Sequence, residues 1–216
     1  MAQKLEHRKE TPSQTAGPYV HIGLAPGAAG FEIFERELGQ VIAGPQSKGE
    51  RIRVEGRVLD GAGAPVTDVL IEVWQANAQG RYNHPEDTSE PEVESDFPAD
   101  FSGWGRVIPD FETGVFSFET VKPGPVPETG PGTTGRSQAP HLSLWLVARG
   151  INLGLNTRMY FADEAEANAA DPVLGRIESA ARRRTLIAGR DNTGSLPVYR
   201  FDIHLQGASE TVFLDI

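Results

Sequence analysis

The sequence of 216 residues contains no cysteine, which excludes disulfides, thiolate metal sites and cysteine nucleophiles together. Any metal ion would therefore need histidine, tyrosine or carboxylate ligands. The chain also has no apolar run long enough to span a bilayer, and residues 1–19 lack the apolar core of a signal peptide. We therefore expect a cytoplasmic protein.

Basic residues are in deficit, since 20 Lys and Arg stand against 30 Asp and Glu and give a net charge of −10. Such a surface repels nucleic acid and anionic membranes, so neither is expected as a partner. The sequence also lacks GxSxG, GxGxxG and phosphate-loop motifs. Its five histidines show neither H-x-H nor H-x-x-x-H spacing. Residue types alone therefore indicate a β-rich globular protein without a recognisable catalytic motif.

Short alternating segments are what the sequence does contain, separated by some of its 24 glycines and 16 prolines. Side chains alternate between the two faces of a strand, so a period of two predicts half-buried strands. The alternating segments are residues 52–58, 69–74, 115–120, 141–149, 155–161, 199–205 and 211–216. At least seven strands without a dividing linker predict one domain, residues 1–216, that is a mainly β protein: a β-sandwich of mixed or antiparallel sheets.

Helix signals are few. Asp171 followed by Pro172 is typical of a helix N-terminus and Gly189 of a helix end, so one substantial helix is predicted between them. An Ala/Glu-rich helical turn is predicted after Asp163, and a short helix over residues 31–38.

Two segments lack any period. Residues 83–103 are acidic and interrupted by proline, which predicts a long loop. A metal site made of His84, Glu86 and Asp87 is the less favoured interpretation, because acidic loops are usually solvated. Residues 1–30 form an N-terminal arm, which is either a frayed terminus or a segment ordered by packing on a neighbouring subunit.

The segment 139–150 carries two chemically notable side chains. In an extended strand His141, Ser143 and Arg149 share one face, whereas the leucines between them face the core. His141 and Arg149 would lie about 25 Å apart at roughly 3.3 Å per residue, so they are not expected to serve one small ligand. Taken alone, a histidine at the start of a strand is most often a structural hydrogen-bonding residue.

Four segments together resemble one family, the intradiol ring-cleaving dioxygenases. They are TPSQTAGPY (residues 11–19), LIEVWQANAQGRY (70–82), VKPGPV (121–126) and APHLSLWLVARG (139–150). The resemblance covers nearly the whole chain. It implies a β-sandwich core and an O2-dependent cleavage of a catechol ring between its two hydroxylated carbons, performed at ferric iron.

The resemblance also assigns four ligand positions. Family members that hold iron use two tyrosines and two histidines spaced H-x-H, and phenolate oxygen suits ferric iron as a hard anionic donor. The first tyrosine matches Tyr82 and the first histidine matches His141, but the second tyrosine position is Val126 and the second histidine position is Ser143. The resemblance therefore implies that this chain binds no metal, has no catalytic residue of its own, and keeps only a vestigial site.

A finer resemblance is to family members built from two homologous chains, of which the partner carries Fe(III). It implies a repeated hetero-oligomer with a substrate pocket at the boundary between the chains. Arg149, Thr15 and Gly17 then become substrate-binding residues, with Arg149 gripping the acid group of a carboxylated catechol. The alternative role for Arg149 is a surface or interface salt bridge.

Two other functions are less favoured. A self-sufficient intradiol enzyme acting on catechol is opposed by Val126 and Ser143. A non-enzymatic, transthyretin-like binding module is suggested only by the hairpin at residues 54–74, a pattern that recurs in many sandwiches.

Overall fold

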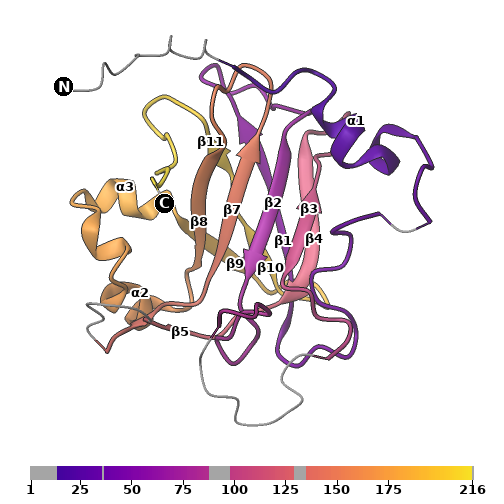
Figure 1. Cartoon of the computed structure of the whole chain (residues 1–216). Coiled ribbons are helices and arrows are strands. Elements are labelled where there is room, and N and C mark those ends of the chain that lie inside the picture. Colours follow the sequence, from indigo (N-terminus) through magenta and orange to yellow (C-terminus); the bar gives the residue numbers. More distant parts are fainter. Residues whose placement is uncertain (1–13, 36, 88–97, 129–134, 216) are drawn as a thin grey trace, which may run out of the picture.

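A computed structural model describes residues 14–35, 37–87, 98–128 and 135–215. Figure 1 shows strands folded over one another, with α2 and α3 on one side and α1 on the other. The strands are β1 (Arg51–Leu59), β2 (Leu70–Gln75), β3 (Trp104–Val107), β4 (Val115–Val121), β5 (Val126–Pro127), β6 (Ser137–Gln138), β7 (His141–Val147), β8 (Leu155–Phe161), β9 (Ile187–Asp191), β10 (Val198–Arg200) and β11 (Ile203–His204). The helices are α1 (Val20–Leu24), α2 (Ala165–Ala170) and α3 (Ala180–Arg184), with 3-10 turns η1 (Pro26–Ala29) and η2 (Leu174–Arg176). No helix in the described ranges is long and apolar enough to cross a membrane.

The main sheet is mixed and nearly closed. Its strand order is β11-β1-β10-β9-β8-β7-β2-β3, and β4 pairs with β1. β1 runs parallel to β10 and β11, and β8 runs parallel to β9, while the other pairs are antiparallel. β5 and β6 form a separate two-stranded ribbon. The mainly β class and the mixed pairing are therefore confirmed.

One continuous core lies between the folded halves of the sheet. Ile52 and Val54 of β1 belong to the same apolar cluster as Val73 of β2 and Leu144 of β7. β7 buries Leu142, Leu144 and Leu146 on one face, as its alternation predicts. Apolar side chains from both halves meet in this way, so each half covers the face that the other must remove from water.

The substantial helix predicted after Asp171 was wrong. Asp171 does cap a turn, because its Oδ1 accepts from the N–H groups of Val173 and Leu174 at 2.8 Å. The turn stops after η2, however, and Ser179 is extended at φ −78°, ψ 118° before it caps the separate helix α3. The residues that follow form β9, which the helix prediction concealed.

Two further predictions need correction. Residues 31–35, 37 and 38 are not helical, and Phe31, Ile33 and Phe34 are exposed instead of sharing a buried face. A helix occurs earlier, at α1, which buries no residue and so leaves no apolar period to detect. The last predicted strand, residues 211–216, reduces to an isolated bridge between Asn156 and Leu214 over its described part.

Asp171 fixes the chain that leads into β7. Its carboxylate is 2% exposed, and it accepts hydrogen bonds from Ala139 N (2.8 Å) and Tyr160 Oη (3.2 Å) as well as from the turn that it caps. A buried carboxylate is tolerated when its lone pairs are filled by donors of this kind. Asp171 therefore joins the helical region to the start of β7.

Replacement of this carboxylate should destabilise the fold. Asp171→Ala leaves buried donors without an acceptor, at about 1–3 kcal/mol each, so we expect a loss of at least about 3 kcal/mol in urea unfolding. Asp110→Ala is the control, since Asp110 also accepts three hydrogen bonds within its turn but is solvent-exposed. Similar losses for the two variants would contradict the role given to Asp171.

Candidate functional site

Tyr82 and His141 are hydrogen-bonded to each other. Tyr82 lies in the loop after β2, His141 begins β7, and Tyr82 Oη is 3.3 Å from His141 Nε2. His141 Nδ1 lies 2.7 Å from the carbonyl oxygen of Ala139. A carbonyl only accepts, so Nδ1 carries the proton, Nε2 is the acceptor, and Tyr82 donates to it. Tyr82 and His141, which are both of a type that can bind metal, thus fill each other's hydrogen-bonding capacity.

Burial keeps both groups neutral. His141 is 1% exposed, and burial, helped by the positive charge of Arg158, lowers the pKa of its imidazole to about 4. Burial also raises the pKa of the Tyr82 phenol, although Arg158 opposes that shift. At pH 7 the pair is a neutral phenol bonded to a neutral imidazole, whereas a ferric ion would require the phenolate.

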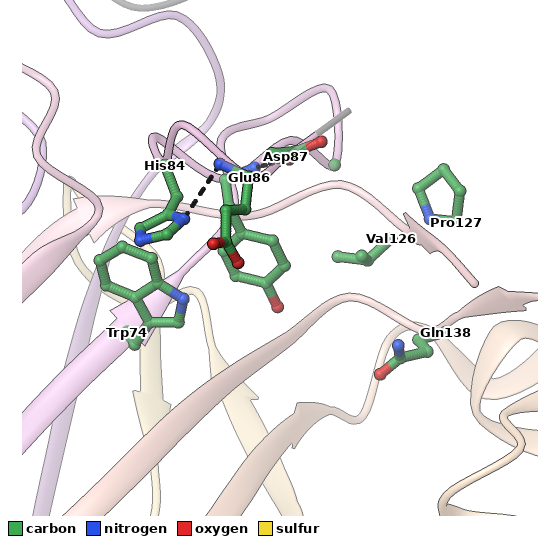
Figure 2. A pocket seen from close by; sticks show the side chains of 9 residues that line it. Trp74, His84, Glu86, Asp87, Val126, Pro127 and Gln138 are labelled. Atoms are coloured by element: carbon green, nitrogen blue, oxygen red, sulfur yellow. Dashed lines mark hydrogen bonds between the residues drawn. The ribbon is translucent and has the colours of Figure 1, made fainter. Parts of the chain in front are cut away.

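A hollow of about 400 Å³ opens beside this pair. Figure 2 shows Trp74 and His84 on one side of it and Val126, Pro127 and Gln138 on the other. The rings of Trp74 and Tyr82 are parallel, with an interplanar angle of 2° and centroids 5.8 Å apart. The lining is therefore mixed: the apolar side chains of Trp74, Val126 and Pro127 stand beside the polar ones of Tyr82, His84, Glu86, Asp87 and Gln138.

Close backbone contact brings the two loops of this hollow together. Gly80 has φ +81°, and a Cβ there would overlap the carbonyl oxygen of Pro125. Gly124 N also donates to Asn77 O at 2.9 Å. Glycines at these positions allow the loop that carries Tyr82 to lie against the loop that carries Val126.

The residues present do not fit a ferric ion. Val126 has no donor atom, and Ser143 does not line the hollow; it lies further along β7, opposite Trp74 and Arg158. His141 and Tyr82 use their donor atoms on each other. Over the described ranges, no group of three or more His, Cys, Asp or Glu residues could hold a metal.

His84, Glu86 and Asp87 all line the hollow, but two of them bond to the local backbone. His84 Nδ1 accepts from Glu86 N at 3.2 Å, and Asp87 Oδ2 accepts from Tyr82 N at 2.6 Å. These atoms hold the loop in shape instead of converging on one point.

Arg149 lies just beyond the other end of β7. Figure 1 shows that the tip of β7 points to the end of the sandwich opposite β5, where the described part of the arm runs. Ala16 forms an isolated parallel bridge with Arg149, and Thr15 Oγ1 is 3.5 Å from the carbonyl oxygen of Ala148. The structure therefore brings the segment containing Thr15 and Gly17 next to Arg149, well away from the Tyr82–His141 pair.

Three residues near these sites were missed by sequence reasoning. Asp68 Oδ2 lies 2.8 Å from Arg149 Nε. Arg158 bonds Gln138 Oε1 at 2.6 Å and acts electrostatically on the Tyr82–His141 pair. Asp171 was expected only as a helix cap. Each role depends on contacts between segments that are distant in sequence, and only the antiparallel pairing of β2 with β7 could have suggested Asp68.

Comparison with known proteins identifies the class. The sequence profile of a family described as Dioxygenase matches residues 33–207. The chain belongs to this family, the intradiol dioxygenases.

Particular relatives narrow the comparison. The chain is 46% identical, over 98% of both lengths, to the protocatechuate 3,4-dioxygenase alpha chain of Pseudomonas putida. It is 41% identical to the beta chain of Burkholderia cepacia protocatechuate 3,4-dioxygenase, over 76% of this chain and 67% of that one. The solved structure of hydroxyquinol 1,2-dioxygenase from Pseudomonas putida DLL-E4 shares the fold, with a TM-score of 0.57, 22% identity, and coverage of 92% of this chain and 68% of that one.

The buried histidine should make stability depend on pH. Between pH 6.5 and about 4 the unfolded chain protonates His141 while the folded chain does not, so stability falls as the pH is lowered. The loss across this window should reach about 3 kcal/mol, because the folded and unfolded pKa values differ by about 2.5 and each unit corresponds to about 1.4 kcal/mol. His141→Gln should be less stable at pH 7 but should show a flatter profile in urea unfolding from pH 7 to 4.5. Parallel profiles for the two proteins would contradict the assignment.

Proposed function

We propose that this chain is the alpha, iron-free chain of a protocatechuate 3,4-dioxygenase. Together with a homologous beta chain that binds Fe(III), it would form a repeated alpha/beta assembly. That assembly would cleave protocatechuate with O2 to 3-carboxy-cis,cis-muconate. This chain would complete the substrate pocket and would contribute no catalytic residue.

The observation that carries this proposal is the state of the four ligand positions. Val126 and Ser143 supply no adequate donors, and Tyr82 and His141 are engaged with each other. A self-sufficient catechol dioxygenase would need donors at all four positions. Similarity to an alpha chain over 98% of both sequences supports the specific assignment and disfavours a transthyretin-like binding module.

The role proposed for this chain lies at the Arg149 end of β7. A guanidinium offers planar, paired N–H donors that match a carboxylate, the group that distinguishes protocatechuate from catechol. The arm residues Thr15 and Gly17 lie on either side of Ala16, which bridges to Arg149, and would provide further contacts. Arg149 is 63% exposed, so a partner chain and a substrate can reach it.

Metal content tests the iron-free assignment. The purified chain should contain well under one iron per molecule and should be colourless, because the red-brown colour of a ferric tyrosinate needs a phenolate ligand. Elemental analysis and a visible spectrum give the answer. Stoichiometric iron that is lost in Tyr82→Phe would overturn the proposal.

Substrate preference tests the role of Arg149. A hydrogen bond to a charged group contributes about 1.5–3 kcal/mol, so Arg149→Ala in the assembled enzyme should lower kcat/KM for protocatechuate roughly 10- to 150-fold. Catechol lacks the carboxylate and is the control, so its turnover should stay nearly unchanged with iron content intact. Equal losses for both substrates would indicate a structural or interface role instead.

A further inference from the structure

Arg149 is held from within the chain by Asp68. Asp68 Oδ2 lies 2.8 Å from Arg149 Nε. β2 and β7 are antiparallel, with Leu70 opposite Val147, so continuing this register by two residues places Asp68 opposite Arg149. The ion pair is thus a cross-strand pair at the end of the β2–β7 ladder, where two side chains on one face meet.

The two partners differ in exposure. The Asp68 side chain is 13% exposed, whereas that of Arg149 is 63% exposed. Asp68 directly precedes Val69 and Leu70, which are fully buried, so the core fixes its position. An ion pair with one largely solvated member contributes little to stability, so its main effect is to orient the guanidinium.

The contact leaves the carboxylate-binding edge of Arg149 available. A guanidinium has five N–H donors in a planar fork, and the nitrogen of Arg149 that lies against the Asp68 carboxylate in the ion pair is Nε. No other side chain in the described ranges pairs with Arg149, so its Nη1 and Nη2 atoms can still donate two parallel hydrogen bonds to a second carboxylate. The negative charge of Asp68 weakens the attraction for that second anion, but a pre-oriented side chain loses less entropy when it binds.

We propose that Asp68 is a positioning residue that directs Arg149 toward the substrate carboxylate and so favours carboxylated catechols over catechol. The inference rests on the proposed function, in which Arg149 receives that group. Both residues line a hollow of about 630 Å³, so the oriented guanidinium lies where a small molecule has access.

Steady-state kinetics of the assembled enzyme on protocatechuate and catechol test this role. Asp68→Ala should raise KM for protocatechuate roughly two- to fivefold, since it removes the orientation but not the guanidinium, and should change kcat less than about twofold. Catechol kinetics should not change. Asp68→Asn keeps the side-chain shape, so its KM for protocatechuate should rise less than that of Asp68→Ala. Asp68→Glu keeps the charge, so it should retain part of the preference for protocatechuate over catechol that Asp68→Ala loses. Because Asp68 acts through Arg149, the double variant Asp68→Ala/Arg149→Ala should be no worse than Arg149→Ala.

Glu72→Gln is the matched control. Glu72 lies in β2, four residues after Asp68, and likewise contacts an arginine Nε at 2.8 Å, that of Arg106, but it does not line the hollow beside Arg149. It should leave the substrate preference unchanged.

The outcomes separate the two proposals. If Arg149→Ala lowers kcat/KM for both substrates equally, the substrate role of Arg149 is overturned, whatever the kinetics of the Asp68 variants. If Arg149→Ala reduces the preference for protocatechuate over catechol while the Asp68 variants do not, only the positioning role of Asp68 is overturned. That role is also overturned if Asp68→Ala impairs both substrates equally, or if its effect persists in the Arg149→Ala background.

Discussion

The start of β7 depends on two hydrogen bonds to the backbone of Ala139. Its N–H donates to the buried carboxylate of Asp171, and its carbonyl accepts from Nδ1 of His141. Asp171 in turn accepts from Tyr160 Oη and from the first N–H groups of the η2 turn. One carboxylate therefore couples the helical region to the strand that carries His141. A buried donor without an acceptor is unfavourable, so no member of this set can be removed without leaving another unsatisfied.

Hydrogen bonds also give Tyr82 and His141 a structural role at a site that does not fit a metal. Removal of either Tyr82 or His141 would leave the other with an unmatched polar atom in a buried environment. The tautomer with Nδ1–H on a backbone carbonyl is also the one that presents Nε2 to a metal. The pair is therefore supported as a ligand pair would be, and what separates it from the four-donor site that the family resemblance implies is that Val126 and Ser143 supply no adequate donors.

Alternation identified the sandwich because its long strands each bury one face, as β1 and β7 do. β3 was not predicted because it has only four residues. β9 was concealed because a cap signal at Asp171 suggested a longer helix than the extended residues Ile177 and Ser179 allow. The candidate site came from similarity of segments and not from any period. The contacts of Asp68, Arg158 and Asp171 depend on tertiary packing, for which a single sequence has no local pattern.

The two ends of β7 can change independently. Leu142, Leu144 and Leu146 fix the strand in the core, and its pairing with β2 and β8 is set along its whole length. His141 at one end is enclosed, whereas Arg149 beyond the other end is exposed and held by a residue that the same core positions. Donors can therefore be lost at the enclosed end without moving the exposed end. In the proposed assembly, the fold of this chain would hold the guanidinium and the arm at the boundary with the partner chain, and the redox chemistry would belong to the partner chain.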